Sequence, residues 1–290
     1  MNELNGFKIK DYNVHGFKQG STTAICPVCS HTRKPENQKV KCMSLFWKDG
    51  LGVCNHCSEK RLQLHTYEKK QTNKTYLKPI VNDSKRDISN ELESYAKEHR
   101  RISLDTLKRL KIHSATSWMP KAKKEISVIK IPYYFHGELL NVKYRGANKD
   151  FKFEKGCEKI IYNIDAIVGE KECIITEGEP DTWSYVEAQL YNCVSVPNGF
   201  TLPRADGTSS INTDYLDNYY QIFESKEKIY LALDNDEAGK CGEAELIRRF
   251  GAEKCWLVDF KDCKDANEYL IKYGVESLRN TITDAKQVPL

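Results

Sequence analysis

Acidic side chains follow three apolar runs in the C-terminal half of this chain, and their spacing could support metal chemistry. Glu177 lies in IITEGEPD, Asp234 and Asp236 lie in LALDNDEAGK, and Asp265 lies in KDCKDANE. Carboxylates that converge repel one another unless a cation neutralises them. Oxygen ligands of this kind suit Mg²⁺ or Mn²⁺. The acids of these three segments, taken together, therefore predict a divalent metal site.

Helix capping is a second explanation for acids at these positions, because Asp and Glu also favour helix starts. One acidic pair after a strand fits either explanation, whereas three acidic ends in one sheet favour the metal. The further acids in the three segments are Glu179, Asp181, Asp262 and Glu268.

Two Cys-x2-Cys pairs lie nearer the N-terminus. Cys26 and Cys29 are separated by 24 residues from Cys54 and Cys57. Two such turns can close a tetrahedral structural zinc site, and the β-rich segment between them, with its KDG turn, predicts a zinc ribbon. The alternative is four reduced cysteines without a metal. Cys42 falls outside the pattern, and we expect it to be a small buried residue.

Ribbons of this type usually bind other molecules, and nucleic acid is the expected ligand here. Arg33 and His56 offer positive or hydrogen-bonding groups, and Trp47 could stack on a base. The alternative for Trp47 is packing in the small core of the ribbon.

Composition narrows the class of protein. The chain has 290 residues with 40% apolar side chains, enough for a packed core. It has 11 cysteines but no secretory signal, which favours metal binding over disulfides. No apolar run approaches the roughly 20 residues of a membrane span. We expect a cytoplasmic protein with no membrane partner.

Charge is distributed unevenly. Residues 1–160 carry 32 basic against 17 acidic side chains, and residues 161–290 carry 13 against 24. A basic half suggests a polyanionic partner, and the alternative is two solvated surfaces of opposite sign. The segments ISVIKIPYYF and GELLNVKYRG, joined at HG, predict a hairpin. Lys143 and Arg145 lie at the end of its second strand and Lys149 lies in the following loop, where they could hold phosphates, although lysines also protect ordinary sheet edges.

The elements that must position the acids alternate between strand and helix. Short apolar runs near residues 173–176, 193–196, 229–233 and 255–259 predict buried strands, with helical segments between them. This pattern predicts an α/β fold with a mainly parallel sheet, in which the carboxyl ends of strands meet at one ligand-binding edge.

Glu177 in TEGEPD and the pair in LDNDEAGK resemble the TOPRIM domain of primases and topoisomerases. The order of IPYYFHGELLNVKYRG, ITEGEPDTWS, VSVPNGF, LDNDEAGK and KDANEYL is similar to bacteriophage primase–helicases and their mitochondrial relative Twinkle. The resemblance covers roughly residues 20–275. It implies an α/β TOPRIM domain preceded by an α+β basic subdomain and an N-terminal zinc ribbon.

The resemblance also implies domain limits. They are a ribbon at 13–67, a flexible linker at 68–87, a basic subdomain at 88–170, a TOPRIM subdomain at 171–271 and a tail or helicase linker at 272–290. No G-x-x-x-x-G-K-[ST] phosphate loop occurs in the sequence. We therefore expect the primase part of a longer primase–helicase, with a free-standing primase as the alternative.

A DNA-dependent RNA primase is the function that the resemblance implies. Glu177, Asp234, Asp236 and Asp265 then hold catalytic metal, with Glu177 alternatively the base, and Lys143 and Arg145 engage nucleotide or template. The expected partners are single-stranded DNA, ribonucleoside triphosphates, a replicative helicase domain and a replisome DNA polymerase. The alternatives are a nucleic-acid-binding module with an inactive TOPRIM domain and a TOPRIM nuclease or topoisomerase.

Overall fold

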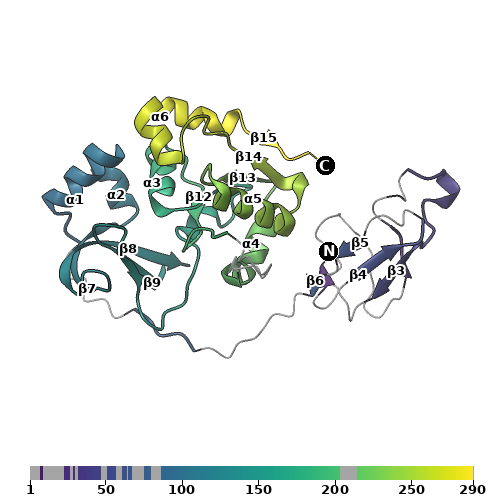
Figure 1. The fold of residues 1–290 in the computed structure, drawn as a ribbon, viewed down its shortest axis with the longest axis horizontal. Helices are drawn as coiled ribbons and strands as arrows, with labels where there is room; N and C mark the ends of the chain where they lie inside the picture. The colour runs from purple at the N-terminus through teal and green to yellow at the C-terminus, as the bar shows by residue number, and fades with distance from the viewer. Residues whose placement is uncertain are drawn as a thin grey trace. The chain divides into compact units, whose positions relative to one another are not determined.

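The computed structural model describes residues 7–8, 23–26, 29, 32–46, 51–56, 61–63, 65–66, 75–79, 86–202 and 214–289. The chain divides into two compact units, shown in Figure 1. The first comprises residues 1–73 with 246–252, and the second comprises residues 74–245 with 253–290.

Antiparallel pairing builds the first unit. A four-stranded sheet has the order β2 (Thr23–Ala24), β3 (Met43–Phe46), β4 (Leu51–Cys54) and β5 (Arg61–Gln63). A separate pair joins β1 (Phe7–Lys8) to β6 (His65–Thr66), and a 3-10 turn, η1, spans Pro35–Asn37. The predicted hairpin between the cysteine pairs is confirmed, because Met43 pairs with Cys54 and Phe46 pairs with Leu51.

Two serine-capped helical segments follow in the second unit. α1 (Asn90–Ser94) continues into η2 (Tyr95–His99), a π-helical turn, and α2 (Leu104–Arg109) comes next. Ser89 caps α1 and Ser103 caps α2, since each side chain accepts a bond from a free backbone N–H at the helix start.

A four-stranded antiparallel sheet then forms, with the order β10 (Phe151–Phe153), β9 (Glu138–Arg145), β8 (Lys124–Phe135) and β7 (His113–Met119). His136 and Gly137 both adopt positive φ in the β8–β9 turn, as a tight hairpin requires. The predicted hairpin is therefore confirmed. Its core face buries Met119, Val128 and Val142.

The second sheet of this unit is mainly parallel, as predicted. Its order is β12 (Cys193–Ser195), β11 (Glu172–Thr176), β13 (Lys228–Ala232), β14 (Cys255–Leu257) and β15 (Lys286–Gln287). Only β15 pairs antiparallel in this sheet. β11 and β13 are buried at every position after their first residue, which explains their continuous apolar runs.

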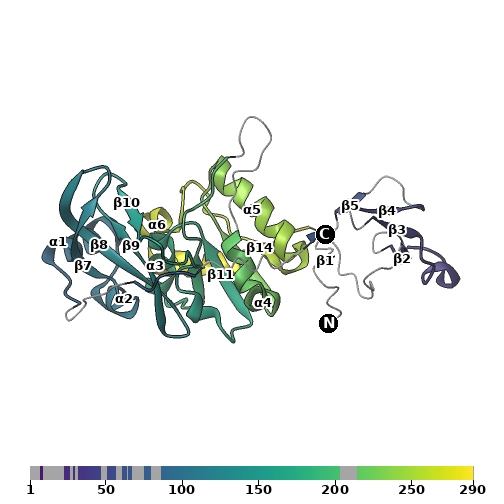
Figure 2. The same cartoon turned by 90° about the horizontal axis from the view of Figure 1, so that it is seen from below.

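Helices cover both faces of the parallel sheet (Figures 1 and 2). The helices are α3 (Glu179–Glu187), α4 (Tyr220–Glu224), α5 (Glu237–Phe250) and α6 (Ala266–Thr283). Single 3-10 turns are η3 (Ile164–Ile167), η4 (Asp214–Tyr219) and η5 (Ala252–Lys254). α3 lies beside α6 on one face, and α4 and α5 lie on the other. The chain moves one way from β11 to β12 and the opposite way from β13 to β14, so connections of the same hand place their helices on opposite faces of the sheet.

Two predicted segment limits need correction. The predicted tail contains regular structure in its described part, because α6 continues to Thr283, where Leu278 and Thr281 are buried, and β15 extends the sheet. Part of the predicted linker also pairs with the second unit, since Leu77 N donates to Gly156 O at 2.9 Å. The composition of both segments is polar enough to hide these contacts from sequence analysis.

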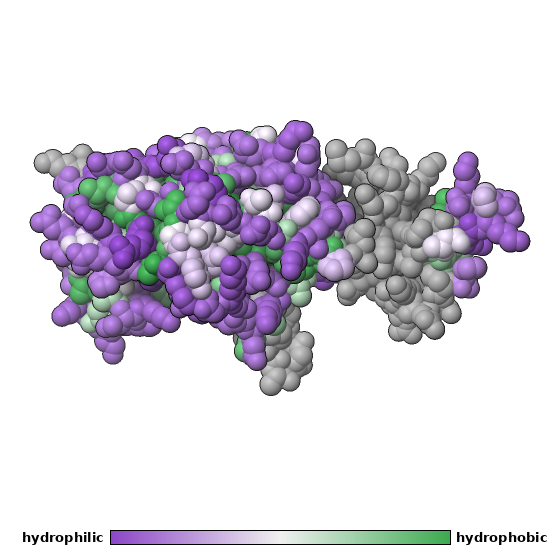
Figure 3. All heavy atoms as spheres, turned by 90° about the horizontal axis from the view of Figure 1, so that it is seen from above, coloured by the Kyte–Doolittle hydropathy of each residue, from purple (hydrophilic) through white to green (hydrophobic). Residues whose placement is uncertain are grey.

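Hydrophilic side chains dominate the molecular face shown in Figure 3. Within the described residues, every helix is too short or too polar to cross a lipid bilayer.

Candidate functional site

Three of the predicted metal ligands come from adjacent parallel strands. Glu177 follows the last residue of β11, and Asp234 and Asp236 follow β13, its hydrogen-bonded neighbour. The chain leaves these two strands in opposite directions. Their carboxyl ends therefore form the switch point at which open α/β sheets bind ligands.

Glu177 is held in a half-buried setting that disfavours its charge. Its Oε1 accepts a hydrogen bond from Phe200 N at 3.0 Å. Its Oε2 is buried and accepts no bond from any described residue. Burial, followed by the charges of Asp234 and Asp236, raises the pKa of Glu177 to about 7.

Glycines allow close packing around the Glu177 carboxylate and the turn that carries Asp234. A Cβ at Gly199 would lie 3.1 Å from Glu177 Oε1, and one at Gly239 would lie 1.9 Å from the Asp234 carbonyl oxygen. Gly242 accommodates the Phe200 ring in the same way, with a would-be Cβ only 2.3 Å from a ring carbon. Side chains at these positions would push apart the turns that carry the acids.

A lysine lies between the two acids of the Asp-x-Asp pair. Lys264 Nζ is 2.5 Å from Asp234 Oδ2 and 3.0 Å from Asp236 Oδ2. Burial nevertheless raises the pKa of Asp234, with Lys264 opposing that effect. A hydrogen bond from Gly239 N, at 3.0 Å, leads the effects that lower the pKa of Asp236.

Asp265 belongs to the same group, and so does Asp181, which the sequence analysis did not select. Asp181 is buried, and its pKa is raised well above its usual range by burial and then by the charges of Asp265 and Asp234. Its Oδ1 accepts a bond from Asn267 N at 3.2 Å. The Asn267 side chain in turn accepts from Arg100 at 2.8 Å. The available sequence signal was the position of Asp181 four residues after Glu177.

Capping explains some of these acids but not all of them. Asp236 accepts from Gly239 N at the start of α5, and Asp265 accepts from Glu268 N at 2.8 Å as the N-cap of α6. Glu177 and Asp234 cap no helix, because their bonds go to Phe200 and Lys264. The two explanations therefore coexist at one edge.

Three acids of the predicted segments have partners outside the group. Glu179 forms a buried ion pair with Lys143 Nζ at 2.6 Å and also accepts from the Tyr133 hydroxyl. Asp262 pairs closely with Lys272 and accepts from the Tyr273 hydroxyl at 2.7 Å. A third, Glu268, accepts from Lys264 N at 2.5 Å.

The donor set fits a hard divalent cation. It offers carboxylate oxygens from three segments, including the buried Oε2 of Glu177, which has no bond partner among the described residues. The carboxylate oxygens are not arranged as the ligands of one ion, because the Lys264 ammonium lies between those of Asp234 and Asp236. In the described part of the chain, the one group of metal-binding side chains with all ligand atoms within 4.8 Å is Cys26, Cys29 and Cys54.

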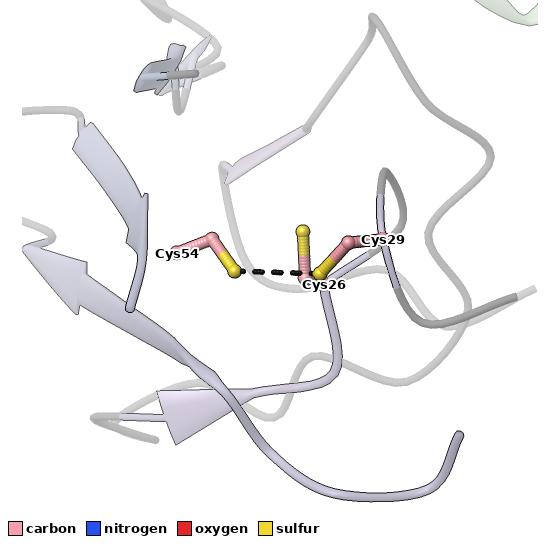
Figure 4. Close-up of side chains that lie close together, drawn as sticks. All are labelled: Cys26, Cys29 and Cys54. Carbon is pink, nitrogen blue, oxygen red and sulfur yellow. Dashed lines mark hydrogen bonds between the residues drawn. The ribbon is translucent and has the colours of Figure 1, made fainter. Parts of the chain in front are cut away.

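The sulfur atoms of these three cysteines face one another in Figure 4. All three residues are buried, and the Cys29 and Cys54 sulfurs are 3.6 Å apart. Cys42 is half-buried, with its sulfur 3.7 Å from that of Cys54, so it lies closer to the group than expected. Cys57, the predicted fourth ligand, lies outside the described residues. A soft thiolate set of this kind suits zinc.

The predicted phosphate-binding residues have different settings. Lys143 is buried, and besides Glu179 it donates to Pro197 O at 2.9 Å. Arg145 is half-buried at the end of β9, opposite Phe151 of β10. Lys149 lies in an exposed loop, where its carbonyl accepts from Lys121 Nζ at 2.9 Å. Lys143 is therefore bound to Glu179, the first residue of α3.

The predicted nucleic-acid contacts of the first unit are partly described. Arg33 is half-buried and its carbonyl accepts from Gln38 at 3.1 Å. His56 is exposed, and its backbone N–H donates to the Cys54 sulfur at 3.3 Å. Trp47 lies outside the described residues.

One pocket formed by described residues lies away from the acids. It measures about 720 Å³ and is lined by residues that include Ser103, Arg109 and Tyr191. Tyr191 precedes the first residue of β12, at the opposite edge of the parallel sheet from the carboxyl ends. We therefore assign the site by chemistry and topology, not by pocket size.

The sequence is similar to a protein family and to two plant proteins. Residues 174–270 match the Toprim-like family. The chain is 36% identical to the primase homolog protein of Arabidopsis thaliana over 204 residues, which cover 66% of this chain and 58% of that protein. It is 30% identical to the Twinkle homolog protein, chloroplastic/mitochondrial, of the same plant over 289 residues, which cover 92% and 39%.

Among solved structures, the primase fragment of the bacteriophage T7 primase-helicase protein has the same fold. The TM-score is 0.54 at 22% identity, covering 84% of this chain and 95% of that chain. The chain thus spans between two fifths and three fifths of the two curated relatives, and nearly all of this fragment.

Proposed function

The chain belongs to the family of primases and primase–helicases that carry a Toprim-like domain, and on that premise we propose that it is a DNA primase. It would make short RNA primers on single-stranded DNA as the primase part of a phage-type primase–helicase. The observation that carries this proposal is the placement of Glu177, Asp234 and Asp265 at one edge of a parallel sheet. There burial and the charge of Asp234 raise the pKa of Glu177, and burial and the charge of Asp265 raise the pKa of Asp234.

The acids would take two roles in nucleotidyl transfer. Asp234, Asp236 and Asp265 would hold Mg²⁺ or Mn²⁺. When bound, such ions lower the pKa of the attacking 3′-hydroxyl and neutralise charge on the phosphate. Glu177, with its pKa near 7, is suited to accept the hydroxyl proton near neutral pH or to bind metal itself through Oε2.

Cationic side chains of the antiparallel sheet would bind phosphates of nucleotide or template. Arg145 and Lys149 are our proposed contacts, because both reach solvent. Lys143 could join them only when its ion pair with Glu179 opens. In the closed pair it would instead orient α3, which begins at Glu179.

The first unit would read the template. Cys26, Cys29, Cys54 and Cys57 would hold a structural zinc that fixes the ribbon, and Arg33, Trp47 and His56 would contact bases or phosphates. We propose a ribbon within 13–67, a tether within 68–87, a basic subdomain at 88–170 and a TOPRIM core from 171 that includes α6 and β15.

Four partners follow from this function. They are single-stranded DNA, ribonucleoside triphosphates, a helicase domain in the same chain and the DNA polymerase that extends the primer. The basic charge of residues 1–160 supports a polyanionic template on that side.

Primer synthesis on a pool of random single-stranded DNA, with labelled ribonucleotides and Mg²⁺, tests the proposal. We expect short RNA products whose sequences reveal the preferred template. Asp234→Ala should abolish them without unfolding the protein, because it removes one negative charge from a group of repelling acids.

The control is Asp262→Ala, since Asp262 pairs with Lys272 away from the acids and should retain full synthesis. No product from the unaltered protein over broad template sampling would favour the inactive binding module. Cleavage of the labelled DNA would favour the nuclease. Unchanged synthesis by Asp234→Ala would contradict the metal assignment.

A further inference from the structure

The side chain of Lys264 lies where a cation is needed. Its ammonium contacts one oxygen of Asp234 at 2.5 Å and one of Asp236 at 3.0 Å. No other described basic side chain forms an ion pair with either acid. The two residues on either side of Asn235 therefore share a single intramolecular counterion.

Backbone hydrogen bonds hold Lys264 opposite this turn. Its carbonyl accepts from Asn235 N at 2.6 Å, and its N–H donates to Glu268 Oε2 at 2.5 Å. The Asn235 side chain donates to Lys261 O at 3.2 Å, one turn earlier in the same loop. These backbone bonds fix the position of Lys264 relative to the turn that carries Asp234 and Asp236. The side chain itself is 52% exposed, so the ammonium can move without disturbing the backbone.

An ammonium and a divalent ion cannot both occupy the same carboxylate oxygens. Mg²⁺ requires oxygen ligands at about 2.0–2.1 Å with near-octahedral geometry, and Lys264 now takes one oxygen of each acid. We propose that Lys264 is a built-in competitor of the catalytic cation, displaced from Asp234 and Asp236 when the ion binds. This inference rests on the metal site of the proposed function.

The displacement has two consequences. Without metal, Lys264 relieves the repulsion between Asp234 and Asp236 and keeps the pair close together. With metal, the freed ammonium remains anchored at the edge of the site through its backbone bonds. Phosphate oxygens of a triphosphate bound there would be its new partners. Metal and nucleotide binding are then positively coupled through one side chain.

Calorimetric titration with Mn²⁺ alone, in the absence of nucleotide, tests the competition. Lys264→Met should bind Mn²⁺ about fivefold more tightly, because breaking a half-exposed pair of contacts costs about 1 kcal/mol. The variant Asp234→Asn lacks a proposed metal ligand, so its titration measures the Mn²⁺ that binds elsewhere on the protein. The matched control is Lys272→Met, which removes the same charge from a pair with Asp262 outside the group and should leave Mn²⁺ affinity unchanged.

Lysine side-chain NMR during a Mg²⁺ titration provides an independent readout. The Lys264 ammonium signal, identified by its loss in Lys264→Met, should shift as the ion binds and should stay fixed in Asp234→Asn. Equal or weaker Mn²⁺ binding by Lys264→Met, or an unmoved signal while the ion binds, overturns the inference. Identical Mn²⁺ titrations of the unaltered protein and Asp234→Asn would instead refute the acidic metal site.

Discussion

Replacing Glu177 by glutamine should change how the stability of the metal-free protein depends on pH. The folded state raises the pKa of Glu177 from 4.5 to about 7, so it binds this proton more tightly than the unfolded state does. The stabilising contribution is therefore complete below pH 4.5 and is lost as the pH rises through 7. Glutamine carries no such proton and removes this part of the dependence.

The size of the effect follows from the pKa difference. At about 1.36 kcal/mol per pKa unit, the rise sets an upper limit of about 3.4 kcal/mol. Because the carboxylate is only half-buried, solvent screening reduces this to about 1–2 kcal/mol. We expect the free energy of unfolding to fall by that much more in the unaltered protein than in Glu177→Gln between pH 5 and pH 8.

Urea unfolding at several pH values, without Mg²⁺ or Mn²⁺, provides the measurement. Tryptophan fluorescence is a suitable signal, because Trp183 is fully buried in α3 beside the parallel sheet. Asp181 and Asp234 titrate in the same direction, and comparing the two proteins cancels their shared contribution. The matched control is Glu276→Gln, which removes a negative charge from the exposed face of α6.

The same pH dependence in the unaltered protein and in Glu177→Gln would refute the reasoning. It would mean that Glu177 is as well solvated in the folded chain as in the unfolded one. A dependence as shallow in Glu276→Gln as in Glu177→Gln would contradict it equally, because the control retains Glu177.

Two further predictions concern the buried ion pair and the cysteines. Lys143→Met should lower the free energy of unfolding, measured in urea, by about 3–5 kcal/mol, because it leaves Glu179 buried without its cation. The double variant with Lys143→Met and Glu179→Gln should recover most of that loss. No recovery would show that only packing was lost. Cys54→Ser and Cys57→Ser should each lose bound zinc, as measured by metal analysis, whereas Cys42→Ser should retain it. Loss of zinc from Cys42→Ser but not from Cys57→Ser would make Cys42 the fourth ligand.

Local sequence was sufficient wherever the chemistry was local. The apolar runs at 173–176 and 229–233 became the buried strands β11 and β13, since burial on both faces demands continuous apolar residues. Ser103 capped α2, and His136 with Gly137 formed the hairpin turn, because each depends on a few neighbouring residues. The topology that joins Glu177 to Asp234 followed from the alternation of strand and helix.

Sequence analysis was less successful with the segments at the edges of the fold. Residues 272–289 looked like a tail, yet α6 buries Leu278 against its neighbours and β15 joins the sheet. A two-residue strand carries no periodicity, so its pairing depends on the exposed edge of β14 and not on its own composition.

The sequence by itself determined that acids would meet at the carboxyl edge of a parallel sheet. Only the tertiary structure decided which ones: Asp181 turns into the group, whereas Glu179, two residues earlier, turns to Lys143. It also decided that Lys264 would lie between Asp234 and Asp236. The physical reason is that the direction of a side chain leaving a strand–helix turn depends on the phase of the helix and on the packing of distant elements, and neither is written in the spacing of the acids.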